Sequence, residues 1–150
     1  MSTHFTGTSE EINALDCFIK LLRAANSVNA AASKQIQNAK LTESQFGILE
    51  ALLHLGPLTQ KQLAEKILKS GGNITLVIEN LLKLGLVKKE KHKDDQRCFW
   101  ISLTTNGDNL VKKLFPNHVK IITERLSVLS TNEQALLASL CRKLGKNEQV

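Results

Sequence analysis

The stretch LTQKQLAEKILKSGGNITLVIENLLKLGLVKKEKHKDDQRCFWISLT, residues 58–104, decides the fold of this 150-residue chain. Its first part, residues 59–68, opens with a capping box and carries apolar residues at helical spacing. A polar, glycine-rich turn follows. Residues 73–84 then repeat the helical spacing up to Gly85, which suits the left-handed conformation that ends a helix. We therefore predict two short helices separated by a tight turn.

The period of the pattern then changes from helical to alternating. Residues 86–92 and 98–103 are rich in β-forming residues, and the polar residues 93–97 between them predict a hairpin with a charged tip. A helix-turn-helix followed by such a hairpin is a winged helix-turn-helix, an arrangement that binds DNA. In this interpretation residues 59–68 form the supporting helix, and residues 73–84 form the recognition helix that enters the major groove.

Helical patterns flank this region on both sides. Residues 10–37 read as one long helix, and a capping box at Thr42 opens a shorter one. Past the hairpin, a helix is interrupted at Pro116, which removes one backbone donor and should kink it. A capping box at Ser130 begins a last helix, which we expect to end at Gly145. The predicted fold class is mainly α with a small β-hairpin wing.

Composition and charge restrict the functional classes. The chain carries 20 Lys and Arg against 14 Asp and Glu, a net charge of +6, which suggests an anionic partner. Only 4% of residues are aromatic, which argues against a stacking platform for single-stranded nucleic acid. No apolar run approaches the roughly 18 residues that span a bilayer, and no signal peptide is evident, so we expect no membrane association. The cytoplasm is the expected location.

Cysteines and histidines indicate no cofactor or metal. The three cysteines, Cys17, Cys98 and Cys141, have no CxxC spacing, so neither a disulfide framework nor a thiolate zinc site is expected. The four histidines lack metal-ligand spacing with one another or with a cysteine. No catalytic triad, paired carboxylates, P-loop or GxGxxG motif is present, so we predict that the protein is not an enzyme.

Positive charge is concentrated in residues 83–97, which hold six basic and three acidic side chains. Strand alternation would place Lys89, Lys91 and Lys93 on one face, where they could form a row of phosphate contacts. The alternative is that these lysines only keep a solvated edge strand from aggregating. Because a helix-turn-helix precedes the hairpin, we favour DNA contact.

The predicted recognition helix divides into two faces. Ile74, Val77, Ile78, Leu81 and Leu82 are expected to face the core, which leaves a polar face outside. Lys83 is the only cation of this helix, so reading of guanine by a bidentate arginine is not expected there. Leu76 could contact a thymine methyl group or could pack against the lobe. The predicted DNA contacts before the hairpin are Ser70, Asn73, Thr75, Leu76, Asn80 and Lys83.

Several motifs in this order resemble the MarR family of bacterial regulators. The resemblance covers about residues 12–144 and is most specific in Asp95-Gln-Arg97 followed by residues 101–104 and Gly107. It implies that Arg97 enters the minor groove and that Asp95 holds it in place. The other matching motifs are Leu41-Thr-Glu-Ser-Gln45, Leu58-Thr-Gln-Lys-Gln-Leu-Ala64, Gly72-Asn-Ile-Thr75 and Leu84-Gly-Leu-Val87.

The resemblance also implies how the chain is organised. It predicts a homodimer on a pseudo-palindromic operator in double-stranded DNA, acting as a repressor. Residues 1–40 would be an N-terminal dimerisation helix, residues 41–103 the winged helix-turn-helix lobe that binds DNA, and residues 104–150 the C-terminal dimerisation helices. Family members often release DNA when a small, often phenolic anion binds between the dimerisation region and the lobe. A small-molecule effector is therefore expected.

Candidate effector contacts come from the polar residues of the predicted dimerisation helices. Asn26 and Asn29 continue the seam of the first helix, where they could line a ligand crevice or set the register of a dimer. His118, just past Pro116, could line the same crevice.

Cys17 opens a thiol-based alternative. It precedes Phe18 in the first helix, which is similar to the branch of the family that senses organic hydroperoxides. That branch stabilises its thiolate with two tyrosine hydroxyls, and this chain has no tyrosine. Cys98 and Cys141 are expected to be core or boundary residues. A further alternative is a winged-helix module that binds protein and not DNA.

Overall fold

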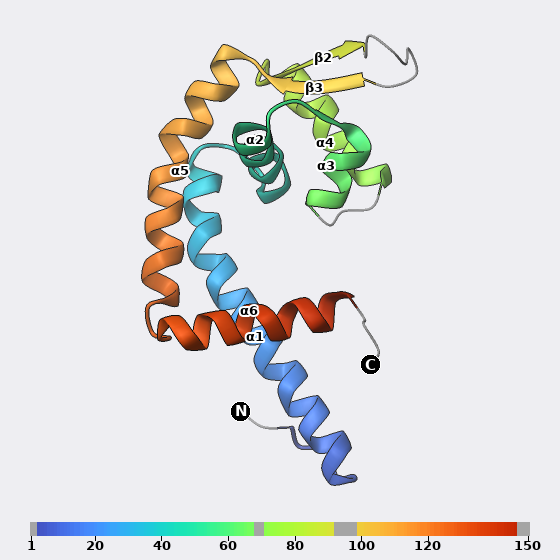
Figure 1. The fold of residues 1–150 in the computed structure, drawn as a ribbon, viewed down its shortest axis with the longest axis vertical. Helices are drawn as coiled ribbons and strands as arrows, with labels where there is room; N and C mark the ends of the chain where they lie inside the picture. The colour runs from blue at the N-terminus through green and yellow to red at the C-terminus, as the bar shows by residue number, and fades with distance from the viewer. Residues whose placement is uncertain (1–2, 68–70, 92–98, 147–150) are drawn as a thin grey trace. The chain divides into compact units, whose positions relative to one another are not determined.

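The computed structural model describes residues 3–67, 71–91 and 99–146 (Figure 1). These residues form six helices and three short strands, so the predicted fold class, mainly helical with a small antiparallel wing sheet, is confirmed. None of the described helices is long and apolar enough to cross a membrane. The elements are α1 (Ser9–Asn38), α2 (Glu43–Leu55), β1 (Leu58–Thr59), α3 (Gln60–Lys66), α4 (Gly71–Lys83), β2 (Val87–Lys91), β3 (Phe99–Leu103), α5 (Thr105–Leu126) and α6 (Thr131–Lys146).

The chain divides into two compact units. One comprises Ala32–His118, and the other combines Met1–Ala31 with Val119–Val150. Helices α1 and α5 each contribute to both units. The first of these units, called the lobe below, extends at both ends beyond the predicted segment 41–103. The assignment of dimerisation and DNA-binding roles to segments of the chain stays a prediction.

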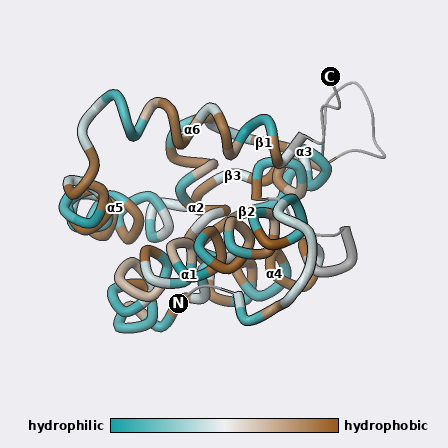
Figure 2. The backbone as a smooth tube through the Cα atoms, turned by 90° about the horizontal axis from the view of Figure 1, so that it is seen from below, coloured by the Kyte–Doolittle hydropathy of each residue, from teal (hydrophilic) through white to brown (hydrophobic). Residues whose placement is uncertain are grey.

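The core of the lobe is built from every one of its elements. Ile36 of α1 and Val111 of α5 are buried together with side chains of α2, α3, α4 and the sheet. Burial of one such side chain stabilises a fold by about 1.5–3 kcal/mol. Figure 2 shows hydrophobic and hydrophilic residues alternating along the helices, as amphipathic helices require. The largest fully buried side chains are Ile48, Leu49, Leu63, Ile74, Leu81, Ile101 and Val111.

Capping boxes start three helices where the sequence predicts them. The Thr42 backbone N–H donates to the Gln45 side-chain oxygen at 2.9 Å, and the Gln45 N–H donates back to the Thr42 hydroxyl. Thr59 caps α3 in the same way. At α6 the Ser130 N–H donates to the Glu133 carboxylate at 2.7 Å. This backbone hydrogen bond, with a second from the Ser130 hydroxyl, lowers the pKa of Glu133.

The wing sheet has the strand order β1-β3-β2 and is antiparallel throughout. Lys89 lies opposite Ile101, and Val87 lies opposite Leu103. The predicted hairpin is therefore present in the described residues, while His92 and Cys98, at the predicted strand ends, lie outside them. Strand β1 was not predicted, because a two-residue strand has no periodicity to recognise.

Three predicted helix boundaries are wrong. Helix α5 continues through Pro116 without interruption, because proline removes only one of the helix's hydrogen bonds and the turn before it, with Leu114 and Phe115, packs against the core. Helix α6 also continues through Gly145, whose backbone is not in the left-handed region. Helix α4 starts at Gly71, earlier than predicted. Gly85, by contrast, ends α4 with a φ of 66°, as expected.

One glycine makes a close backbone contact that holds α5 on the wing. A Cβ atom at Gly107 would lie only 1.9 Å from the carbonyl oxygen of Leu86. That oxygen accepts a hydrogen bond from the Thr104 backbone N–H at 3.1 Å, and the Thr104 hydroxyl donates to the Gly85 carbonyl at 2.6 Å. The start of α5 is thereby fixed to the turn that connects α4 with β2.

Candidate nucleic-acid interface

Helix α4 has one face in the core of the lobe and one face in solvent. Ile74, Ile78 and Leu81 are at most 3% exposed and anchor the helix. The opposite face presents mainly polar side chains. Thr75, Leu76, Glu79 and Lys83 are exposed on it, and Asn80 is half-buried. This division into faces follows the predicted helical periodicity.

Helix α3 holds the first half of α4. Leu63 of α3 is fully buried in the core that also contains Ile74. Outside this core, the Gln60 side-chain amide donates a hydrogen bond of 2.5 Å to the Thr75 hydroxyl. The outward face of α4 is therefore positioned by both a buried apolar contact and a polar contact at the surface, as a rigid recognition element requires.

The lysines of β2 lie on two different faces of the wing. Lys88 forms an ion pair with Glu90 at 2.8 Å, which partly neutralises its charge. Lys89 and Lys91 lie on the other face, by strand alternation, and both are exposed. The Lys89 ammonium lies 4.3 Å from the centre of the Phe99 ring, a cation–π contact that orients it. Two cations thus share one face of β2.

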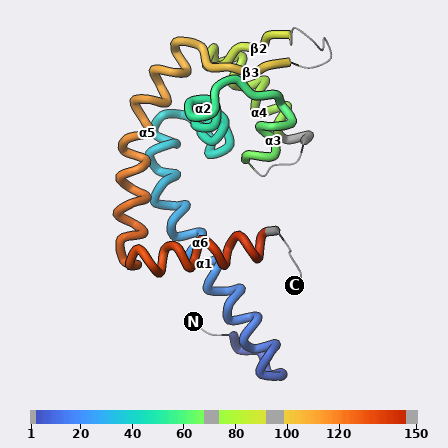
Figure 3. Tube along the Cα trace, in the orientation of Figure 1, coloured from blue at the N-terminus to red at the C-terminus, as the bar shows by residue number. Residues whose placement is uncertain are grey.

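The α4 face and the lysines of β2 are neighbours along the chain. Helix α4 ends at Lys83 and β2 begins at Val87, so only a short turn containing Gly85 separates them. Figure 3 shows the two elements at the same end of the lobe. The Leu86 N–H donates to the Leu81 carbonyl at 3.0 Å, which fixes the exit from the helix. This arrangement can place a polar helix face in a groove of a duplex while the strand beside it contacts phosphates.

Several predicted contacts lie outside the described residues. These are Ser70, Lys93, Asp95 and Arg97. Asn73 belongs to the first turn of α4. The roles assigned to all of these residues stay predictions.

The three predicted effector contacts are divided between the two units. Asn26 and Asn29 are exposed on the part of α1 that precedes Ala32, and His118 ends the lobe. The His118 ring centre lies 4.8 Å from that of Phe46, and the buried Nδ1 has no hydrogen-bond partner among the described residues. The His54 ring meets Phe115 edge-on at 4.7 Å.

Sequence reasoning missed this cluster of two phenylalanines and two histidines, which we call the aromatic cluster (Phe46, His54, Phe115 and His118). It joins α2 to α5 inside the lobe. The only signal available was the spacing of Phe115 and His118, which puts them on one face of a helix.

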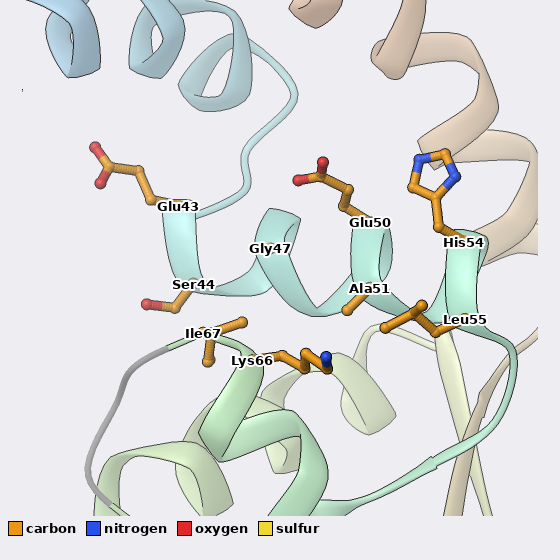
Figure 4. Close-up of a pocket in the computed structure, with 9 residues that line it drawn as sticks. All are labelled: Glu43, Ser44, Gly47, Glu50, Ala51, His54, Leu55, Lys66 and Ile67. Carbon is orange, nitrogen blue, oxygen red and sulfur yellow. The ribbon is translucent and has the colours of Figure 1, made fainter. Parts of the chain in front are cut away.

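A cavity of about 560 Å³ lies between α2 and α3 and was also missed (Figure 4). Small residues of α2, Gly47 and Ala51, face Ile67, the residue that caps the end of α3. Its methyl group would be 3.4 Å from a Cβ at Gly47. In Figure 4, Glu50 and His54 project from the side of α2 away from Ile67. Across the part of the chain that the structure describes, no cluster of side chains has the composition of a metal site.

Cys17 is exposed on α1. Its neighbour Asp16 forms an ion pair with Lys20, one turn further along the helix. Cys141 is also exposed, so the expectation that it is a core or boundary residue is wrong within a single chain. The redox role of Cys17 stays a prediction, and Cys98 lies outside the described residues.

Apolar side chains are exposed along two helices of the other unit. On α1 these are Leu15, Phe18 and Leu22. On α6 they are Leu136, Leu137, Leu140 and Leu144, which repeat at helical spacing. Exposed apolar side chains grouped along one helix make these two helices candidate interaction surfaces.

A helix pair with a buried scaffold, an outward polar face and a lysine-bearing hairpin places the lobe in the winged helix-turn-helix class of DNA-binding domains. The family model described as "MarR family" matches residues 41–99. The chain is 33% identical to the HTH-type transcriptional regulator MhqR of Bacillus subtilis, over 89% of this chain and 92% of that protein. It therefore belongs to the MarR family of DNA-binding transcriptional regulators and is not an enzyme.

Two solved structures show the same fold. Sco3205 of Streptomyces coelicolor, a MarR family regulator crystallised in complex with DNA, has a TM-score of 0.84 and 20% identity over 98% of this chain and 93% of that chain. BpsR of Bordetella bronchiseptica, whose DNA binding is regulated by 6-hydroxynicotinic acid, has a TM-score of 0.76 and 26% identity over 86% of this chain and 98% of that chain.

Proposed function

We propose that this MarR-family regulator is a homodimeric repressor that binds a pseudo-palindromic operator and leaves it when a small aromatic or anionic ligand binds. Helix α4 would enter the major groove, and Lys89 and Lys91 would contact the neighbouring backbone. The observation that carries the proposal is the rigid, outward face of α4 directly followed by two cations on one face of β2. The DNA complex of Sco3205 is consistent with this use of the fold.

The binding mode is tested by selecting bound sequences from a pool of random duplexes. We expect a palindromic site with half-site centres about one helical turn apart, roughly 34–36 Å. Its affinity should fall steeply with added salt, because Lys and Arg contacts release counterions from the phosphates. If the selection recovers no duplex, or if binding does not depend on salt, the protein would instead be a winged-helix module that binds protein partners.

The proposed dimer rests on the exposed apolar faces of α1 and α6. Leu136 and Leu140 are 60% and 55% exposed in the single chain. Covering such residues in a symmetric interface removes apolar surface from water at about 25 cal/mol per Å². The two faces therefore fit contact with a second copy of the chain.

Replacing both Leu136 and Leu140 by aspartate should convert the dimer to a monomer and abolish operator binding. Charged side chains in an apolar interface lose hydration without gaining a partner. Sedimentation velocity measures the oligomeric state. The matched control is Ala138→Asp, which helical geometry places on the opposite face of α6. A double variant that stays dimeric would contradict the assignment of α6 to the interface.

The proposed effector is an aromatic carboxylate or a similar small anion, with Asn26, Asn29 and His118 as candidate contacts. Support comes from the aromatic cluster, which contains His118, and from the regulation of BpsR by 6-hydroxynicotinic acid. Aromatic rings stack on flat ligands, and imidazole and amide groups donate hydrogen bonds to carboxylates.

We expect 6-hydroxynicotinate or benzoate to raise the melting temperature and to lower operator affinity. Ligand at 100 times its Kd stabilises a protein by about 2.7 kcal/mol. Thermal-shift and mobility-shift titrations measure the two effects. His118→Ala should remove both, and His4→Ala, near the exposed N-terminus, should change neither. Failure of all aromatic carboxylates to stabilise the protein at millimolar concentration would exclude this effector class.

A further inference from the structure

We propose that Leu76 reads the 5-methyl group of a thymine, so that each operator half-site specifies thymine at one position through an apolar contact. This inference rests on the proposed function, because it requires α4 in the major groove. In that groove the thymine methyl is the one apolar group among the hydrogen-bonding edges of the four standard bases. A leucine side chain can discriminate on that group alone.

The burial of α4 supports this assignment. Leu76 is 56% exposed, whereas Ile74 and Ile78 are only 1% and 3% exposed. The sequence left open whether Leu76 packs against the lobe or faces outward, and this exposure supports the second possibility. An apolar side chain that stays in water adds little to folding stability. Leu76 would contribute favourable free energy only when DNA covers it.

The chemistry of the surrounding face points to a base edge. One turn beyond Leu76 lie Glu79 and Asn80, and Lys83 lies one turn further. No residue from Gly71 to Lys83 is an arginine, so this helix lacks the bidentate donor that reads guanine. A face with one acid, one amide and one terminal cation obtains little specificity from charge. The apolar contact of Leu76 then supplies a larger share of the discrimination.

The position of Leu76 within α4, and not its exposure alone, distinguishes it from other exposed leucines. Leu55 and Leu84 are each 54% exposed, and single exposed leucines are common on protein surfaces. Leu55 is the last residue of α2, and Leu84 follows the end of α4. Leu76 lies within α4, next to Thr75, whose hydroxyl is held by Gln60 of α3. Its place on the surface is therefore fixed, and Leu55 offers a matched control.

The experiment uses the full chain and the duplex selected from the random pool. Each thymine of one half-site is replaced in turn by uracil, which removes the methyl group and keeps the base-pairing edge. For the unaltered protein, one or two of these replacements should weaken binding about fourfold, the value expected for one buried methyl group. Leu76→Ala should reduce that sensitivity below about twofold at the same positions, while Leu55→Ala keeps it.

The outcomes separate this inference from the proposed function. If the chain binds a palindromic duplex but no thymine is sensitive to uracil, the methyl contact is wrong and the operator function stands. If Leu76→Ala retains the full uracil sensitivity, another residue contacts the methyl group and the inference is wrong. If no duplex is selected, both the proposed function and this inference fail. Circular dichroism spectra of both variants should match the parent chain, since each replaced side chain is more than half exposed.

Discussion

Alanine at Gly107 is expected to destabilise the lobe by about 3 kcal/mol, at the upper end of the effects of overpacking. The added Cβ would lie 1.9 Å from the Leu86 carbonyl oxygen, far inside van der Waals contact. Neither the Leu86 carbonyl nor the Gly107 backbone can move away easily, because hydrogen bonds hold both. The carbonyl accepts the Thr104 N–H, and the Gly107 N–H donates to the Thr104 hydroxyl at 3.1 Å. The variant has to move α5 away from the wing or lose these hydrogen bonds.

Thermal unfolding followed by circular dichroism measures this effect at one fixed protein concentration. A loss of about 3 kcal/mol lowers the melting temperature by roughly 10 °C for a chain of this size. Gly145→Ala is the matched control, because nothing lies within 4 Å of its Cβ position and the residue is helical. It should leave stability unchanged or raise it by up to about 1 kcal/mol. Equal melting temperatures for the two variants would contradict the close contact at Gly107.

Removal of the two cations on one face of β2 should strongly weaken DNA binding. The double variant Lys89→Ala/Lys91→Ala is expected to lose about 10- to 100-fold in affinity at 0.1 M salt. The plot of log affinity against log salt should become shallower by about 2, one for each phosphate contact. The loss should be similar for operator and random duplexes, because phosphates carry no base identity.

The control for this experiment has the same change in net charge at a different place. Lys112→Ala/Lys120→Ala removes two lysines of α5 that form ion pairs with Asp108 and Glu124. It should keep the slope of the parent chain within about 0.5, since each of these exposed lysines is already paired with a carboxylate on the same helix. If both double variants lose the same affinity, binding depends on net charge and not on the wing. Thermal unfolding of the Lys89 variant also reports the lost contact with Phe99.

Features fixed by neighbours in sequence were predicted well. The capping boxes at Thr42, Thr59 and Ser130 each involve residues three apart, and Gly85 ends its helix through its own backbone preference. The anchoring face of α4 follows from helical periodicity. These local signals were sufficient to define the winged helix-turn-helix before any tertiary contact was known.

Features that depend on distant residues could not be predicted. Strand β1 exists only because β3 pairs with it, and α5 remains continuous at Pro116 in the packed lobe. The contact of Gly107 with Leu86 joins residues that no short-range pattern connects. The same holds for the candidate site. The exposure of Leu76 and the cation–π contact of Lys89 required the packed structure.

The shared use of α1 and α5 by the two units limits how such a protein can evolve. Ile36 and Val111 complete the core of the lobe, yet each lies on a helix that continues into the other unit. A recombination event with breakpoints in the loops around residues 41 and 103 would leave both residues behind. The segment 41–103 is therefore not a self-contained folding unit that could be exchanged between relatives without these two helices. Under the proposed function, a change of operator specificity would therefore come from substitutions on α4, at positions such as Leu76.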